Sequence, residues 1–223
     1  DKNKKVSPLF LQKTIYKKIK KENNASGLLV PISEIYLCPG THINTGNPTN
    51  KIETNKLIDN IVLFLSKINQ NILDASSFKY LESIKCDYLQ KSLRFKFPNL
   101  KFIKSNKNTY DISKKFKLTV ETANSTGFLE SLNLNIPIIF IYDKKYCSLR
   151  KSAIKDYNML KRVKILHNSP EEASKFVNEN YDKLEKWWNS KSLQKVKNDF
   201  CYKFARRSNS PLKDLKKALY HGK

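Results

Sequence analysis

The clearest alternation of apolar and polar positions lies in the middle of the chain, between residues 118 and 141. Residues 118–122 alternate apolar and polar side chains with the period of a β-strand, and residues 123–127 are small and polar, as in a turn that begins a helix. A short apolar face follows from Phe128, and Pro137 ends this helix before the apolar run 138–141. The pattern predicts a strand, a tight turn, a helix and a second buried strand, which is the unit of a parallel sheet.

Weaker periodicities on either side of this unit predict further elements. Helical patterns cover residues 52–68, 81–95, 148–162, 170–187, 193–204 and 211–219, and strand-like runs cover 28–37, 100–103 and 163–166. Ser169, Pro170 and Glu172 form a helix start, with Ser169 as the N-cap and Glu172 closing a capping box. We therefore predict an α/β fold with a Rossmann-like parallel sheet, flanking helices and additional helices at the C-terminus.

The turn at residues 123–127 combines two features of phosphate sites. It follows a strand, and open α/β sheets bind their ligands at the carboxyl ends of their strands. The first amides of the next helix lack intrahelical partners and carry partial positive charge, which suits a phosphate beside Ser125 and Thr126. Ser, Thr and Asn also cap helices that bind nothing, so the turn alone leaves both interpretations open.

Several short motifs in the second half of the chain resemble one family in their order. They are Asn124-Ser125-Thr126, Leu129-Glu130, Asn135-Ile136-Pro137, Ile165-Leu166-His167-x-Ser169-Pro170, Ala173, Trp187-Trp188-Asn189-Ser190, Phe200 and Ala205-Arg206. From about residue 118 to 219, this series resembles a family of transferases encoded in gene clusters for O-antigen and other surface polysaccharides. The spacing from Ser125 through Glu130 to Pro137 also resembles the donor-binding, C-terminal half of GT-B glycosyltransferases.

The resemblance implies a chemistry for the turn. It implies that the phosphates of a nucleotide-sugar donor are bound by four residues, Asn124, Ser125, Thr126 and Gly127. Glu130, on the following helix, would bind the donor ribose, and the acceptor would be a glycan or a lipid-linked molecule. GT-B enzymes need no metal for these phosphates, so we expect no metal site and no cofactor besides the nucleotide-sugar substrate. The sequence identifies no catalytic base, which in this fold often belongs to the N-terminal domain.

Two other segments are candidates for the same cleft. Gly40, Thr41 and His42 follow the first predicted strand, although an ordinary surface loop would have the same composition. Tyr142 and Asp143 end the strand after the turn.

The Trp187-Trp188 pair ends an apolar helical stripe. Such a pair either stacks on a sugar or packs in the core, and we assign Trp187 to the core.

The formal net charge of +23 indicates anionic partners. Of the 43 basic residues 38 are lysine and five are arginine, and they are spread along the chain. Nucleic-acid sites favour arginine, so we do not expect a nucleic-acid partner. Nucleotide-sugars, acidic glycans and an anionic membrane surface fit the charge better. Four separated cysteines and three histidines have no metal-ligand spacing, which favours reduced thiols in a cytoplasmic protein. The positive charge adds the inner face of the membrane as a second expected location.

Length limits the domain organisation. A chain of 223 residues has room for about one of the two Rossmann-like domains of a GT-B enzyme. We expect residues 1–27 to be a basic linker or helix left from a preceding domain, 28–206 to be the donor-binding domain, and 207–223 to be a helical tail. The acceptor-side N-terminal domain would then be missing. Two alternatives stay open at this point: a sugar-nucleotide epimerase, and a non-enzymatic domain that binds RNA or other polyanions.

Overall fold

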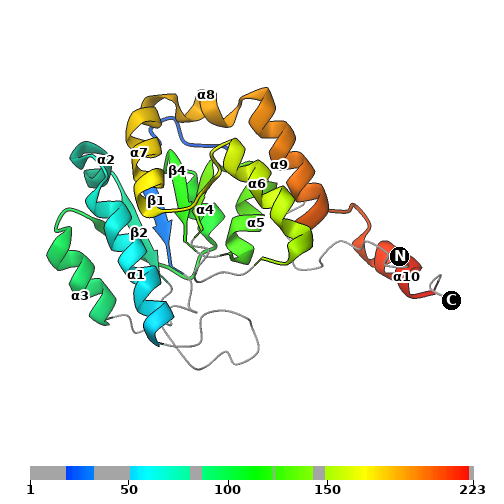
Figure 1. The fold of residues 1–223 in the computed structure, drawn as a ribbon, viewed down its shortest axis with the longest axis horizontal. Helices are drawn as coiled ribbons and strands as arrows, with labels where there is room; N and C mark the ends of the chain where they lie inside the picture. Colours follow the sequence, from blue (N-terminus) through cyan, green and yellow to red (C-terminus); the bar gives the residue numbers. More distant parts are fainter. Residues whose placement is uncertain (1–18, 33–50, 81–86, 123, 143–148, 221–223) are drawn as a thin grey trace.

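The protein contains one sheet of six parallel strands, seen in a computed structural model that describes residues 19–32, 51–80, 87–122, 124–142 and 149–220. The strands follow the order β3-β2-β1-β4-β5-β6 across the sheet (Figure 1). Their bounds are β1 Leu28–Pro31, β2 Ser77–Tyr80, β3 Lys101–Lys104, β4 Leu118–Glu121, β5 Ile138–Ile141 and β6 Leu166–His167. This order is that of the doubly wound Rossmann fold, and the predicted fold class is confirmed.

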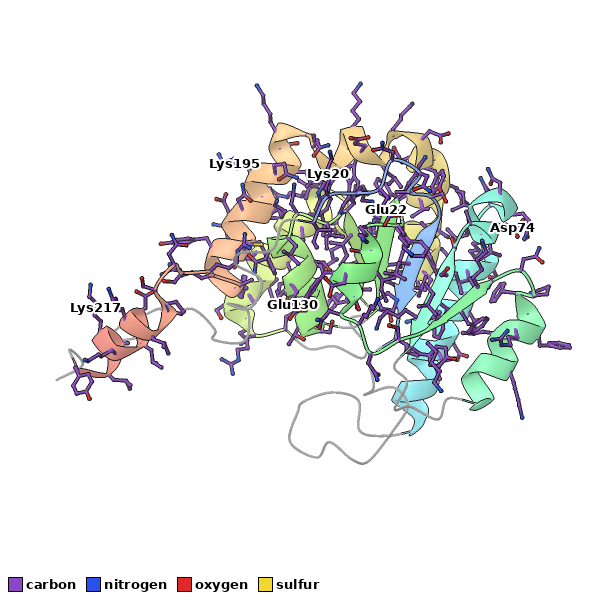
Figure 2. All side chains as sticks on the ribbon, turned by 180° about the vertical axis from the view of Figure 1, so that it is seen from behind. Lys20, Glu22, Asp74, Glu130, Lys195 and Lys217 are labelled. Carbon is purple, nitrogen blue, oxygen red and sulfur yellow. The ribbon has the colours of Figure 1, made fainter. Side chains whose placement is uncertain are left out.

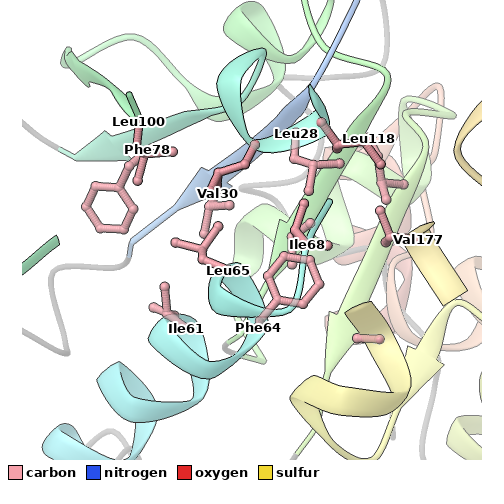
Figure 3. Close-up of a cluster of buried hydrophobic side chains, with 14 of the residues drawn as sticks. Leu28, Val30, Ile61, Phe64, Leu65, Ile68, Phe78, Leu100, Leu118 and Val177 are labelled. Carbon is pink, nitrogen blue, oxygen red and sulfur yellow. The ribbon is translucent and has the colours of Figure 1, made fainter. Parts of the chain in front are cut away.

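Helices α1 (Lys51–Ser66), α2 (Gln70–Asp74), α3 (Asp87–Lys96) and α7 (Pro170–Asn180) pack on one face of the sheet. Ile61, Phe64 and Leu65 of α1 meet Leu28 and Val30 of β1 in a cluster without exposed surface (Figure 3). Strands β1 and β5 are buried on both faces, which explains why their sequences are nearly continuous apolar runs. Most of the hydrophobic core on this face joins elements from the two halves of the chain.

The opposite face is covered by α4 (Thr109–Ser113), α5 (Thr126–Asn133), α6 (Ile154–Arg162) and α9 (Lys191–Phe204). Phe128 of α5, Phe140 of β5 and Phe200 of α9 form the centre of an aromatic cluster, with ring centroids 5.0 and 6.3 Å apart. The connecting turns and short helices are η3 (Lys151–Ala153), η4 (Tyr181–Lys183) and α8 (Leu184–Trp188). Helices thus cover both faces of the sheet, and the candidate site lies at the carboxyl ends of its strands.

The last helix, α10 (Pro211–Tyr220), has no buried residue and stands away from the sheet in Figure 1. Its Leu212, Leu219 and Tyr220 side chains are each at least 70% exposed. α10 corresponds to the helix predicted over residues 211–219.

Several details differ from the sequence-based expectation. The strand predicted over residues 163–166 is displaced, because β6 covers Leu166–His167. The strand β2 was not predicted, because Ser77 and Lys79 interrupt its apolar pattern. The helix predicted over 170–187 is interrupted by η4 at Tyr181. Within the Trp pair, Trp188 is the deeper residue at 2% exposure, whereas Trp187 is half-buried. The 3₁₀ turn explains this shift, because it advances the chain by a larger angle per residue than an α-helix does.

Candidate functional site

The order of the strands reverses direction between β1 and β4. From β1 the chain proceeds outward to β2 and β3, and it then returns to β4 on the other side of β1 before continuing to β5 and β6. The backbone register aligns Leu29 with Thr119, so the two strands end side by side at Pro31 and Glu121. Doubly wound sheets bind ligands outside the strands' carboxyl ends at this reversal. Residues 124–127 of the predicted turn follow β4 and therefore lie at this point.

The turn leads into α5 through Ser125. Its backbone is extended, with φ −105° and ψ 167°, and its hydroxyl oxygen accepts a hydrogen bond from the amide of Phe128 at 3.3 Å. Ser125 is therefore the N-cap of α5, as the sequence predicted. Thr126, the first residue of the helix, is exposed, and Gly127 is half-buried. The amides of these two residues belong to the first turn, which has no acceptor within the helix.

Asn124 connects the turn to α6. Its side-chain oxygen accepts a hydrogen bond from the Tyr157 hydroxyl at 3.0 Å, and the Tyr157 ring packs 5.2 Å from that of Phe200. The turn is thus tied to the aromatic cluster beneath it. This contact gives Asn124 a positioning role, while its predicted contact with phosphate stays a prediction.

Gly127 packs closely on the end of β4. A β-carbon at this position would lie 3.3 Å from Oε1 of Glu121 and 3.4 Å from Oγ of Ser125. Such distances are tight for a β-carbon, so a side chain here would press on the Glu121 carboxyl group. Glycine also leaves the backbone of the turn open to a close approach by a ligand.

Glu121 is a buried acid that the sequence did not single out. It is 5% exposed, and burial raises the pKa of its carboxyl group to about 8. Lys79 and a hydrogen bond with Ser125 act against this rise in pKa, and the carboxyl group of Glu130 adds to it. Glu121 therefore links the sheet to the cap of α5.

Lys79 is the basic counterpart of Glu121. It lies on β2 opposite Pro31 of β1, and its side chain is 4% exposed. Burial lowers the pKa of its amine, and the attraction of Glu121 opposes that fall. Phe78 and Val120, the residues before Lys79 and Glu121, both belong to the core cluster on the face covered by α1 and α7. Because side chains alternate along a strand, Lys79 and Glu121 both lie on the opposite face of the sheet.

Glu130 lies one helical turn after Thr126 and is 6% exposed (Figure 2). Its proximity to Glu121 shows that α5 presents this carboxyl group toward the sheet. The ribose contact stays a prediction for this residue.

Tyr142 is 5% exposed, with its ring 5.8 Å from that of Phe140, and its amide donates to the His167 carbonyl. It is thus part of the aromatic cluster next to the site. The other predicted cleft residues, Gly40, Thr41, His42 and Asp143, lie outside the described residues.

Two hollows of the described structure lie away from this turn. One of about 990 Å³ lies beside β3 and α4, and another of about 660 Å³ lies near the amino ends of the strands, beside Tyr181 and Trp188. Among the described residues, no three His, Cys, Asp or Glu side chains gather in a way that could hold a metal ion. No helix within the described part of the chain is both long and apolar enough to cross a membrane.

Comparisons with known proteins relate the chain to transferases. The family model of the LIC12162 family transferase matches residues 1–219. No curated protein matches the chain. The crystal structure of accessory secretory proteins 1, 2 and 3 in Streptococcus pneumoniae aligns with 92% of this chain and 37% of that chain, at 13% identity and a TM-score of 0.45. The crystal structure of TarM aligns with 93% of this chain and 38% of that chain, at 14% identity and a TM-score of 0.49. The chain spans less than two fifths of the length of either.

Proposed function

Since the chain belongs to the LIC12162 transferase family, we propose that it is the donor-binding half of a glycosyltransferase-like enzyme in surface carbohydrate biosynthesis. In this proposal the turn formed by residues 124–127 holds the phosphates of a nucleotide-sugar. Family membership confirms the resemblance to transferases that the sequence showed. The choice of sugar transfer, and of the turn as its donor site, is the step that we propose.

The observation that carries the proposal is the position of the α5 N-terminus. It lies at the reversal of strand order, it is capped by Ser125, and its first residue, Thr126, is exposed. An anion there would meet unpaired amides and the positive end of the helix dipole. Each dipole contact contributes roughly 0.3–1 kcal/mol, and a hydrogen bond to a charged group contributes about 1.5–3 kcal/mol.

The four residues of the turn would have different tasks. The amides of Thr126 and Gly127 and the hydroxyl of Thr126 would donate to phosphate oxygens. Ser125 already accepts from Phe128 and is hydrogen-bonded to Glu121, so it would hold the turn in shape. Asn124 would keep the turn in place through Tyr157. These assignments make Thr126 the side chain that phosphate binding needs most.

One more donor contact would come from Glu130 in this half, and the rest of the reaction would depend on residues outside it. Glu130 would accept hydrogen bonds from the donor ribose, and a glycan or a lipid-linked molecule would be the acceptor. In this proposal the acceptor site and the catalytic base belong to an N-terminal domain, as the resemblance to GT-B enzymes implies. The phosphates would be neutralised without a metal ion, by the helix terminus and nearby basic side chains.

A thermal-shift titration with CMP, UDP, GDP and their sugar conjugates tests the proposal, with pyrophosphate as the control for general anion binding. We expect one nucleotide to stabilise the protein more than the others do. We expect Thr126→Val to lower the affinity for that nucleotide about tenfold, which corresponds to one lost hydrogen bond.

Ser169→Ala is the matched control for Ser125→Ala. Ser169 caps α7 by accepting from the Glu172 amide at 3.2 Å, so both variants lose the same kind of cap. We expect both to unfold at a lower temperature and only Ser125→Ala to lose nucleotide affinity. Equal stabilisation by every anion, unchanged in Thr126→Val, would refute the donor site.

A further inference from the structure

Positive charge is concentrated along the edge of the sheet at β3, and the structure places these charged residues at that edge. Within residues 91–115 there is one acidic residue, Asp111, beside eight basic ones: Lys91, Arg94, Lys96, Lys101, Lys104, Lys107, Lys114 and Lys115. All eight basic side chains are exposed. Residues 151–220, by comparison, contain 17 basic and eight acidic residues. The charge is therefore distributed unevenly, and we call residues 91–115 the β3 flank.

The β3 flank also presents apolar surface. Phe95, in the last turn of α3, is 90% exposed and lies between Arg94 and Lys96 in the sequence. Arg94 lies over the Phe102 ring of β3 at 4.2 Å, which fixes the end of α3 against the sheet edge. An aromatic side chain held in solvent between two cations on an anchored helix suits insertion into a lipid headgroup layer.

On the other side of β3, the hollow of about 990 Å³ repeats this combination. Its lining includes Ile103 and Ile112, one acid, Asp111, and five lysines: Lys20, Lys104, Lys107, Lys114 and Lys115. Lysine stems can lie along apolar surface while their amines reach anionic groups. Lys114 also pairs with Glu22 at 3.5 Å, but both side chains are more than one third exposed, so this pair cancels little of the positive charge of the lining.

We propose that the β3 flank is a docking surface for an anionic membrane, with Phe95 inserted at the headgroup level and the lysines on the lipid charges. The combination of positive charge with an exposed phenyl ring and aliphatic side chains favours lipid over nucleic acid. Single-stranded nucleic acid is bound by several aromatic faces on which successive bases stack, whereas the described side chains of the β3 flank include one largely exposed ring, Phe95, beside aliphatic isoleucines. This inference does not depend on the donor site, because it needs no nucleotide.

The opposite end of the molecule supplies matched controls. Figure 1 shows α3 and α10 at opposite ends, and α9 leads toward α10. Lys191 and Lys195 of α9 are exposed lysines, and Tyr202 is an aromatic side chain with 64% exposure. Lys195 and Lys217 mark this end in Figure 2.

Co-sedimentation with vesicles tests the proposal, using phosphatidylcholine alone and phosphatidylcholine mixed with phosphatidylglycerol. We expect binding to the anionic vesicles only, weakening as salt is raised. Lys104→Glu/Lys107→Glu is expected to weaken binding by about 25-fold or more, because each lysine contributes about fivefold near an anionic surface. Phe95→Ser is expected to weaken it severalfold with the same net charge.

The controls Lys191→Glu/Lys195→Glu and Tyr202→Ser are expected to bind as the unaltered protein does, with thermal unfolding showing that every variant is folded. An equal loss for the α9 charge reversal would mean that net charge alone drives binding and would overturn the proposal. Binding to an RNA oligomer that depends on the β3 flank, without binding to anionic vesicles, would also overturn it and would identify a polyanion partner instead. All of these binding measurements are made without nucleotide, so a negative result does not count against the donor site.

Discussion

The buried carboxyl group of Glu121 is hydrogen-bonded to Ser125, the residue that caps α5 at the reversal point of the sheet. One residue thereby connects the end of β4 with the turn that we propose to hold phosphates. Lys79 on β2 faces the same side of the sheet and supplies the nearby positive charge. The electrostatic support of the site thus comes from two strands that are separated in the sheet by β1.

The raised pKa of Glu121 predicts how the stability of the fold changes between about pH 4.5 and pH 8. The unfolded chain releases this proton near pH 4.5 and the folded protein near pH 8, so the folded state binds more protons between these values. Its contribution to the free energy of unfolding therefore decreases as pH rises through this window. We expect Glu121→Gln, which cannot ionise, to lose less stability than the unaltered protein between pH 5 and pH 9. Chemical denaturation at several pH values measures this difference, and parallel curves for the two proteins would contradict the account.

The lowered pKa of His167 predicts that the stability of the fold decreases in acid. Its side chain has no exposed surface, burial lowers its pKa from 6.5 to about 4, and Nε2 lies 3.0 Å from the Lys164 carbonyl oxygen. The folded state binds fewer protons than the unfolded chain between these values, so stability falls as pH decreases from about 6.5 to 4. We expect a loss of about 3 kcal/mol from this group over that range.

His167→Gln should remove most of that loss, which denaturation curves at pH 7 and pH 4 would measure. An unchanged difference between the two pH values in the variant would show that His167 does not titrate as described.

The two described glycines that pack against other atoms should respond differently to alanine. Gly27 has φ +66°, and a β-carbon there would lie 1.9 Å from the Ala75 carbonyl oxygen, so backbone would have to move. At Gly127 the nearest atom, 3.3 Å away, belongs to the Glu121 side chain, which can adjust. We expect Gly27→Ala to destabilise the fold by about 3 kcal/mol or more, and Gly127→Ala by about 1 kcal/mol.

Calorimetry of both glycine variants measures the difference in stability, and similar losses would refute the distinction. Gly127→Ala should in addition reduce nucleotide affinity, because its methyl group presses on the carboxyl group beneath the turn.

The Trp pair gives a further test of the core. Trp188 donates to the Asn135 carbonyl at 3.1 Å and is 2% exposed, whereas the half-buried Trp187 donates to the Val163 carbonyl at 3.0 Å. We expect Trp188→Ala to cost about 3–5 kcal/mol and Trp187→Ala clearly less. Equilibrium unfolding in denaturant measures both values, and the reverse ranking would show that Trp187 is the deeper residue after all.

The elements predicted from sequence are those with strong local signals. Alternation, turn residues and Pro137 together indicate the unit from β4 to β5, and Ser169 caps α7 as predicted. Even there, the capping box differs in one contact, because the Glu172 side chain accepts from the amide of Asn168 and the sequence rule expects Ser169. Local patterns were sufficient to predict these elements, because each element contains its own start and stop signals.

The missed features depend on neighbours that no local pattern contains. β2 lacks a continuous apolar run because Lys79 faces the buried acid Glu121, and that relationship exists only once β1 lies between the two strands. The position of the β3 flank was likewise missed, because the sequence does not show that β3 is an edge strand of the sheet. The acid beneath the turn could have been suspected from Glu121 alone, as a charged residue at the end of an otherwise buried strand.

The most direct test of the central claim follows the backbone amides of an ¹⁵N-labelled protein by NMR while the preferred nucleotide is added. The account predicts that the largest chemical-shift changes occur at Thr126 and Gly127, and that Thr126→Val weakens them, while the amides of the β3 flank change little at physiological salt. Changes confined to the lysine-rich β3 flank, or spread evenly over the basic surface, would contradict a donor site at the N-terminus of α5.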